Sequence, residues 1–210
     1  MKKTFVIAVI AFFVICFIAP MSVFAEERAE ESFGKVTIFA GPEYMNFGDI
    51  KIDGESDIGI DSKLGLNVGL GVKITDNIGV EASWSGFRLN EGDLDLPAED
   101  AAIDIDADVD YVSLGPIFSY KAGERVTLNA GFGGYWCHLD FNVSGPGFSE
   151  SDGGSAFGGY AKAGAMVNLY KMINLDLSAG YRDGQDISIF DDGDVETGGA
   201  YGTALVKINF

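Results

Sequence analysis

The stretch that decides the fold is "SKLGLNVGLGVKI", Ser62 to Ile74. From Leu64 to Ile74 every second residue is apolar, and the residues between them are glycine, asparagine or lysine. A period of two is typical of a β-strand whose two faces meet different surroundings. The run is long for a strand of a globular protein and suits the roughly 9–11 residues of a tilted transmembrane strand. It therefore predicts a strand with one face against lipid.

The same alternation recurs along the chain, and the connections between its repeats alternate in length. The further strands are predicted at 36–44, 78–84, 112–120, 126–136, 161–169, 173–181 and 200–210. Three connections are short (75–77, 121–125 and 170–172), and four are long (about 48–62, 90–108, 139–157 and 183–197). Short turns at one end and long loops at the other are typical of outer-membrane barrels.

We therefore predict an all-β fold, an eight-stranded antiparallel up-and-down transmembrane β-barrel over residues 35–210. A closed barrel pairs every backbone N–H and C=O within lipid and leaves no edge strand. The alternative is a soluble β-sandwich, which also alternates but has no reason to sort its loops by length.

The N-terminus has the pattern of a secretory signal peptide. Lys2 and Lys3 precede an unbroken apolar run of 14 residues, 5–18, and small residues lead up to Ala25. We predict a cleavable signal peptide at 1–25 and a short N-terminal segment at 26–34. The alternative, a retained transmembrane helix, would need about 20 apolar residues.

Composition narrows the possible partners. The predicted mature chain keeps 32 acidic residues against 12 basic ones, a formal charge of −20, so we expect no nucleic acid partner. Most acids fall in the four long loops. We expect outer-membrane lipid and lipopolysaccharide as surroundings, with divalent cations between the like charges, and a monomer. Only Cys137 remains, so no internal disulfide is possible.

The last strand, "YGTALVKINF", has a final aromatic preceded by apolar residues at every second position. With the signal peptide, the eight strands and the loop asymmetry, the chain resembles the small eight-stranded outer-membrane barrels, the OmpA-transmembrane-domain and OmpX/OmpW-like group. The resemblance implies a C-terminal assembly signal, read by the barrel-assembly machinery, at Phe210, Ile208, Val206 and Ala204. It also implies an outer-membrane location with extracellular long loops and both termini in the periplasm. It identifies an architecture rather than an activity.

The inward register of the predicted strands carries charges of both signs. We predict a lumen charge network of Glu43, Lys73, Glu81, Lys162, Asp176, Arg182 and Lys207. Buried charges are tolerable when paired, and an eight-stranded barrel is just wide enough for side chains to fill. The lumen is then a packed polar plug or, in the alternative, a narrow path for small solutes.

The segment "DIDADVD" holds the weak candidates for a metal site, Asp104, Asp106, Asp108 and Asp110. Carboxylates suit Ca²⁺ or Mg²⁺, but strict alternation without a glycine turn is not an EF-hand. We expect no cofactor beyond a possible weak divalent cation at the outer loops. A solvated loop is the alternative.

His138 is the only histidine and follows Trp136 near the outer rim. Outer-membrane lipid A deacylases use a rim histidine with a serine and an acid, but their His-x-Ser spacing would need serine where this chain has Asp140. We therefore expect no enzyme. The candidate functions are a structural or surface-interaction barrel without a large pore, a narrow channel, and a lipid A-modifying hydrolase.

Overall fold

The computed structural model describes residues 36–47, 50–52, 60, 62–90, 104–189 and 193–210. The predicted signal peptide at 1–25 and the segment at 26–34 lie outside these ranges. Within them, no helix is long and apolar enough to span a membrane.

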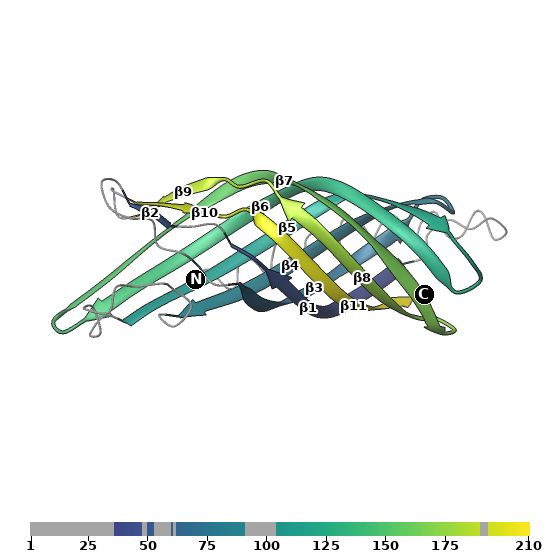
Figure 1. Ribbon diagram of the computed structural model, residues 1–210, viewed down its shortest axis with the longest axis horizontal. Helices are drawn as coiled ribbons and strands as arrows, with labels where there is room; N and C mark the ends of the chain where they lie inside the picture. The colour runs from purple at the N-terminus through teal and green to yellow at the C-terminus, as the bar shows by residue number, and fades with distance from the viewer. Residues whose placement is uncertain (1–35, 48–49, 53–59, 61, 91–103, 190–192) are drawn as a thin grey trace, which may run out of the picture.

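Eleven strands make two sheets (Figure 1). They are β1 (Val36–Met45), β2 (Ile50–Ile52), β3 (Lys63–Lys73), β4 (Ile78–Asn90), β5 (Asp104–Lys121), β6 (Val126–Gly145), β7 (Phe148–Tyr170), β8 (Ile173–Arg182), β9 (Asp186–Ile189), β10 (Gly193–Glu196) and β11 (Gly199–Asn209). Eight of them close an antiparallel barrel in the order β1-β11-β8-β7-β6-β5-β4-β3. The predicted eight-stranded barrel is confirmed.

The first and last strands close the barrel in register. Ile38 lies opposite Ile208, and Glu43 lies opposite Thr203 on the same antiparallel register. Pro42 lies within β1 and has no N–H to donate to the ladder. Pairing with β11 lapses at Gly41 and Pro42 and resumes in the same register at Glu43, while pairing with β3 is continuous. The strand therefore continues through the proline.

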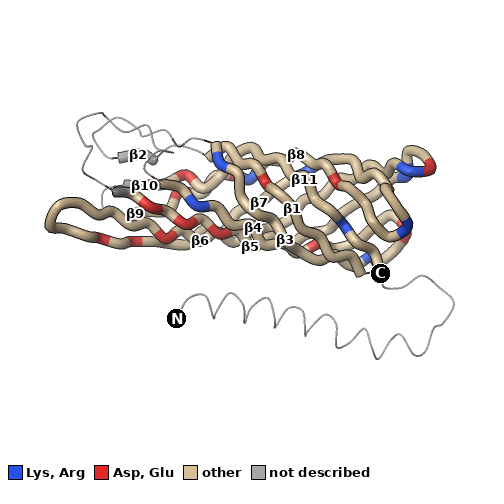
Figure 2. The backbone as a smooth tube through the Cα atoms, turned by 90° about the horizontal axis from the view of Figure 1, so that it is seen from below, with Lys and Arg blue, Asp and Glu red and all other residues tan. Residues whose placement is uncertain are grey.

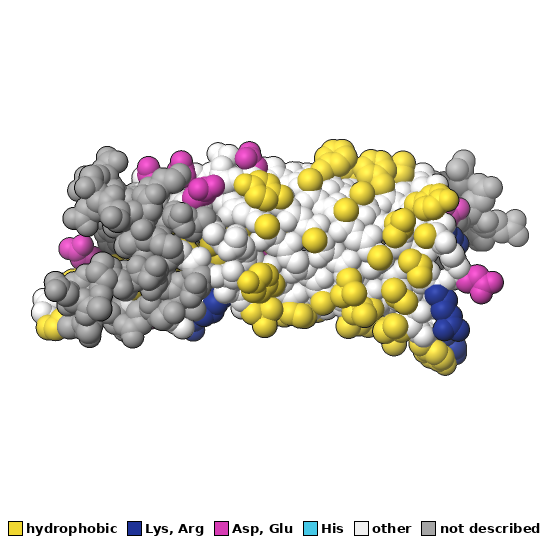
Figure 3. Space-filling model, viewed as in Figure 1, with side chains coloured by type: hydrophobic (Ala, Val, Ile, Leu, Met, Phe, Trp, Pro, Cys, Tyr) yellow, Lys and Arg dark blue, Asp and Glu magenta, His cyan; other side chains and the backbone are white. Residues whose placement is uncertain are grey.

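The outward face of the barrel is an apolar belt. Leu64, Phe132 and Leu177 leave half or more of their surface exposed, and every strand of the barrel carries similar exposed apolar side chains. Figure 3 shows one face of this belt, where hydrophobic side chains lie over the barrel between its two ends. A continuous apolar surface of this kind is costly in water and marks a site of contact with lipid or another apolar partner. We call the end of the barrel with the three short turns and Phe210 the turn end, and the opposite end the loop end.

At the loop end three strands run much further than predicted. Residues 104–108 and 139–157, expected as loops, belong to β5, β6 and β7, and the third loop shrinks to the turn at Pro146 and Gly147. Gly147 has φ 94°, which suits the third position of a type II turn after proline. Apolar and polar residues alternate over 104–108 and 139–143, which indicates strands, and the expectation of loops is wrong there.

The first and fourth loops join in a second sheet, which the sequence did not predict. Its order is β2-β10-β9, with Ile187 of β9 opposite Val195 of β10. Both side chains are buried and belong to the same apolar cluster as Leu139 and Phe141 of β6. The small sheet thus packs onto the core at the loop end (Figure 1).

The loop end has the opposite polarity to the rest of the barrel. Ile105, Ala107 and Val109 of β5 point inward and are at most 9% exposed, whereas Asp106 and Asp108 between them point outward. Below this level, toward the turn end, the polar face points inward and the apolar face points outward. The same strands therefore build a polar-cored barrel and, past its rim, an apolar-cored extension with acids outside. Figure 2 shows acidic positions gathered along the strands at the loop end.

Candidate functional site

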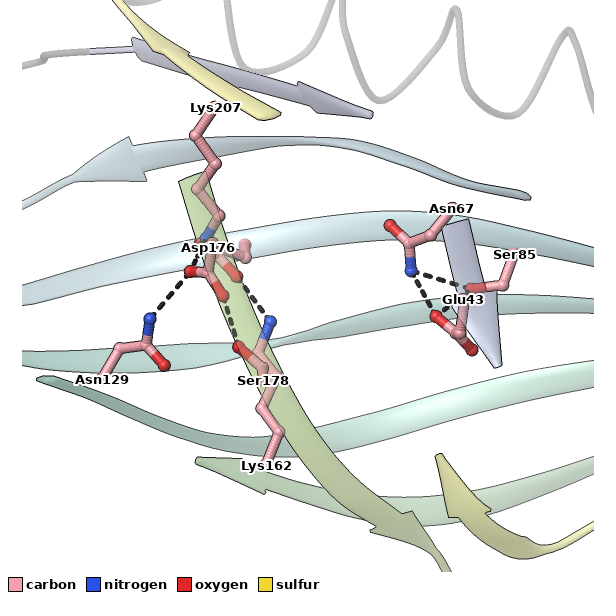
Figure 4. Close-up of polar contacts among 9 residues, drawn as sticks. Glu43, Asn67, Ser85, Asn129, Lys162, Asp176, Ser178 and Lys207 are labelled. Carbon is pink, nitrogen blue, oxygen red and sulfur yellow. Dashed lines mark hydrogen bonds and ion pairs between the residues drawn. The ribbon is translucent and has the colours of Figure 1, made fainter. Parts of the chain in front are cut away.

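The lumen contains two layers of buried charge. The first layer is centred on Glu81 of β4, which meets the Nζ atoms of Lys162 at 2.7 Å and Lys207 at 2.6 Å. Lys207 of β11 also lies 3.0 Å from Oδ2 of Asp176 on β8. Four strands from different parts of the barrel thus contribute two cations and two anions to one network, part of which Figure 4 shows.

Neutral polar groups complete this first layer. Asn129 of β6 donates from Nδ2 to Oδ2 of Asp176 at 2.7 Å, and the Ser178 hydroxyl donates to the other oxygen of the same carboxylate (Figure 4). A buried carboxylate is tolerable when both of its oxygens are paired. The layer is therefore charge-balanced and rigid.

The second layer lies nearer the loop end and is centred on Arg182. Its Nη1 lies 2.7 Å from Oε1 of Glu43, and both side chains are almost fully buried. Asn67 donates to Oε2 of Glu43 at 2.6 Å, and the Ser85 hydroxyl donates to the same oxygen at 3.0 Å (Figure 4). This carboxylate is held from three sides.

Two tyrosine rings enclose the Arg182 guanidinium. Its Cζ lies 4.2 Å from the Tyr111 ring centroid and 4.4 Å from that of Tyr201. Such cation–π contacts strengthen when they are desolvated. We call Arg182 and the two tyrosine rings the arginine clamp. The Tyr111 hydroxyl also donates to the carbonyl of Thr197 at 2.6 Å, which connects the arginine clamp to the segment between β10 and β11.

On the loop-end side of the arginine clamp, the apolar core fills the bore. It contains Phe87, Leu139, Phe141 and Ile187, and the space left inside it is about 10 Å³. A cavity of about 10–15 Å³ holds one water molecule. Between the two charged layers another space of about 20 Å³ remains. Within the described residues, the lumen is therefore closed over its outer half.

Six of the seven predicted lumen charges lie in these layers, and Lys73 departs from the prediction. Its Nζ lies 3.2 Å from Oδ1 of Asp76, at the turn after β3, and both side chains are substantially exposed. Lys73 lies at the end of β3, where its side chain lines the mouth of the lumen at the turn end, apart from the two charged layers.

Within the part of the chain that the structure describes, the turn end of the lumen is open. A cavity of about 370 Å³ lies there, with Glu81, Asp176 and Lys207 of the first layer at its closed end. Thr37, Ser119 and Thr127 are among the residues that line it. We call this cavity the vestibule.

The acidic run faces outward on the extension. Asp106 and Asp108 are exposed, Asp110 is half-buried, and nothing is described of the Asp104 side chain. Arg88 of β4, the cation opposite Asp108, lies 3.0 Å from its Oδ1. Among the described residues no group of three potential metal ligands comes together.

His138 lies in the same outward row as Asp110 and Ser155. Its Nδ1 is 2.9 Å from both the Ser155 hydroxyl and the Gly154 carbonyl, and its Nε2 is 3.3 Å from Oδ2 of Asp140. The ring stacks on Trp136 with centroids 5.5 Å apart. A serine and an acid thus lie beside His138. The His-x-Ser spacing did not predict this serine, because Ser155 comes from the neighbouring strand β7.

One contact sets this arrangement apart from a simple hydrolytic triad. The Gly154 carbonyl lies as close to Nδ1 as the Ser155 hydroxyl does and can only accept a hydrogen bond, so it competes with Ser155 for Nδ1 whenever that nitrogen carries the proton. A base must instead accept the proton of the serine hydroxyl. The contacts of His138 are those of a side chain fixed on the surface of a sheet.

The residues of the predicted assembly signal lie on the outward face of β11. Phe210, Ile208 and Val206 are exposed and Ala204 is partly exposed, while Leu205 and Lys207 between them are buried. The Phe210 N–H donates to the Val36 carbonyl at 2.8 Å, which ties the two ends of the barrel together. The role of these residues in assembly stays a prediction.

Comparison with known proteins agrees with this architecture. Residues 14–206 match the outer membrane protein beta-barrel domain. The chain belongs to this family. Its apolar belt is thereby the surface that an outer-membrane barrel turns to lipid.

Solved structures of outer-membrane proteins share the fold. A major outer membrane protein from Thermus thermophilus matches at 11% identity and a TM-score of 0.58, covering 85% of this chain and 100% of that one. Neisserial surface protein A matches at 13% identity and 0.54, covering 83% and 97%. Ail, the attachment invasion locus protein of Yersinia pestis, matches at 24% identity and 0.48, covering 83% and 99%. No curated protein sequence matches the chain.

Several residues of the outer-membrane barrel's lumen were not predicted from sequence. Asn67, Ser85, Asn129 and Thr197 complete the two layers, and none is charged. For Asn67, Ser85 and Asn129 the available signal was inward register on strands beside a predicted charge, whereas Thr197 lies between β10 and β11 and has no such signal. Sequence alone gives the register but not the pairing across the bore.

Proposed function

We propose that this outer-membrane barrel is a non-conducting anchor that presents a rigid, acidic β-sheet to the outside of the cell. In this proposal residues 1–25 are removed on export, the turn end lies in the periplasm and the loop end is extracellular. The barrel-assembly machinery reads the strand that ends at Phe210, and the folded protein is a monomer without a resident cofactor.

The observation that carries the proposal is the reversal of polarity along β4 to β7. Below the reversal, Trp84, Trp136 and Phe157 face outward; above it, the outward positions hold Asp108 and Asp140. Aromatic side chains are typical of the membrane interface, and charges belong beyond it. The extension therefore stands outside the bilayer, where its apolar core holds it rigid and closes the bore.

The acidic face is suited to cationic partners. Exposed Asp106 and Asp108 and partly exposed Asp140 lie on two adjacent strands of the same surface, with Arg88 beside Asp108. Complementary charge of this kind steers association and weakens as salt rises. Divalent cations would bridge the same surface weakly to lipopolysaccharide phosphates, and calorimetry with Ca²⁺ in the millimolar range tests that bridge.

The test of the surface role is retention on a polylysine-coated sensor. The double variant Asp106→Asn with Asp108→Asn, carried in nanodiscs, should bind several-fold more weakly than the wild type at low salt. The matched control, Asp76→Asn with Glu124→Gln, removes two exposed acids from the turn end. Equal weakening by the two double variants would contradict a specific role for the loop-end sheet.

We infer that the barrel has no hydrolase activity, because Nδ1 of His138 shares the Gly154 carbonyl. We therefore expect the lipid A mass spectrum of an overexpressing strain to match that of a strain with the His138→Ala variant. Loss of an acyl chain in the first strain only would restore the enzyme hypothesis.

A further inference from the structure

The vestibule has the size of a ligand site. Its volume of about 370 Å³ falls within the roughly 300–1,000 Å³ of small-molecule pockets. All eight strands of the barrel contribute to its wall, and the turn after β3 forms part of its rim. The strands of a closed barrel hold this wall in one shape.

The vestibule is a dead end. Glu81, Asp176 and Lys207 lie at its inner limit and are joined by ion pairs of 2.6 and 3.0 Å. Beyond them, Arg182 and Glu43 close the next layer at 2.7 Å. A solute that enters from the turn end meets bonded charges instead of a path. The geometry is that of a receptor and not of a conduit.

The charges around the vestibule are largely compensated. Lys207 is bound between Glu81 and Asp176, and Lys73 pairs with Asp76 at the rim. Lys121 is the remaining cation on the wall and is exposed at the end of β5. The inner surface therefore offers little net charge to an ionic ligand.

Amides and hydroxyls supply the free hydrogen-bonding capacity. Among the described residues, the hydroxyls of Ser119 and Thr127 have no protein partner. Asn209 accepts from Thr37 at 2.8 Å through its oxygen, and no described residue accepts from its Nδ2. Hydroxyls and amides both donate and accept, as the hydroxyls of a polyol require. Ile117 and Met166 add apolar area to the same wall.

We propose that the vestibule binds a small, neutral, hydroxyl-rich molecule of one or two sugar rings. Alternating donors and acceptors match its hydroxyl groups, and the apolar wall matches its C–H faces. That the ligand enters from the periplasm rests on the orientation given under Proposed function. The binding itself requires only that the turn end be open.

The test uses the full barrel in detergent micelles, labelled with ¹⁵N, and the disaccharide trehalose as the probe. Side-chain amide signals of the vestibule asparagines should shift and saturate at millimolar trehalose. Thr127→Phe, which fills the vestibule, should weaken binding by about tenfold or more, equivalent to about 1.4 kcal/mol. Leu128→Phe is the matched control, because the neighbouring side chain faces lipid.

Ser119→Phe, on the adjacent strand β5, serves as a second blocking variant. Heat-modifiable migration shows that each variant has folded. Citrate and putrescine should bind more weakly than trehalose. Absence of saturation, equal binding by both phenylalanine variants of β6, or stronger binding of either ion would overturn the inference. A barrel that does not conduct and does not bind trehalose would contradict this inference alone. A barrel that conducts and binds trehalose would contradict only the proposal of a closed lumen.

Discussion

Arg182 is the residue that links the polar barrel to its apolar extension. It is 2% exposed, pairs with Glu43 and lies between the rings of Tyr111 and Tyr201. A buried cation of this kind is stable only while its counter-charge stays in place. The pair therefore fixes the positions of β1 and β8, which lie on either side of β11 in the barrel.

Arg182→Met should destabilise the folded barrel by about 3–5 kcal/mol, because it leaves Glu43 buried without its cation. Urea unfolding in lipid, followed by heat-modifiable migration, measures the change. The double variant Glu43→Gln with Arg182→Met should recover much of the loss. If the double variant is as unstable as the single one, packing rather than charge explains the site.

Phe210 is the residue on which assembly should depend. Replacing it with aspartate, or deleting it, should lower the amount of folded barrel in the outer membrane while the exported chain accumulates in the periplasm. Cell fractionation with heat-modifiable migration measures both. Asn209→Asp, the lumen-facing neighbour, is the control. Wild-type amounts of the Phe210→Asp barrel in the membrane would show that the last strand is not the signal.

At the scale of elements, β6 shows how one strand serves two environments. Its inward side chains change from Asn129, which binds Asp176, to Leu139 and Phe141, which lie in the apolar core. Its outward side chains change from Leu128 and Phe132 to Asp140 at the same time. The strand alternates throughout, and only the assignment of its two faces is reversed.

Leu139→Asp should loosen the extension and leave the membrane barrel intact, because it places an unpaired carboxylate in the apolar core. Proteinase K should then cut the β6–β7 hairpin in intact cells, and a folded membrane fragment should remain. Asp140→Asn, one residue further on the outward face, should stay resistant. Equal resistance of both variants would contradict a core that holds the extension rigid.

The strands in the membrane could be predicted from sequence because lipid requires an apolar side chain at every second position of all eight. Leu64 to Ile74 follows that rule without exception. Beyond the membrane the rule reverses, so "DIDADVD" is a strand with its apolar residues inward. The lumen charges were predicted from inward register. That register does not specify which side chains meet inside the bore, so it did not predict that Lys73 lies apart or that Asn67 and Ser85 bind Glu43. The β2-β10-β9 sheet joins two distant loops, and no local pattern specifies it.

At the scale of the whole molecule, one closed sheet combines an apolar belt, a charge-balanced lumen and an acidic cap. The belt of exposed Leu64, Phe132 and Leu177 fits an outer-membrane barrel, as the family assignment requires. The lumen offers an open vestibule at the turn end and two bonded layers and an apolar core beyond it. The molecule is therefore suited to span a membrane without forming an open pore.

Conductance of the purified barrel in planar lipid bilayers tests this account most directly. The wild-type protein, shown by heat-modifiable migration to be folded, should give no steady current step after insertion. The Arg182–Glu43 layer and the core around Leu139 close the bore. A stable, reproducible step of porin size from the folded wild-type barrel would contradict the closed lumen.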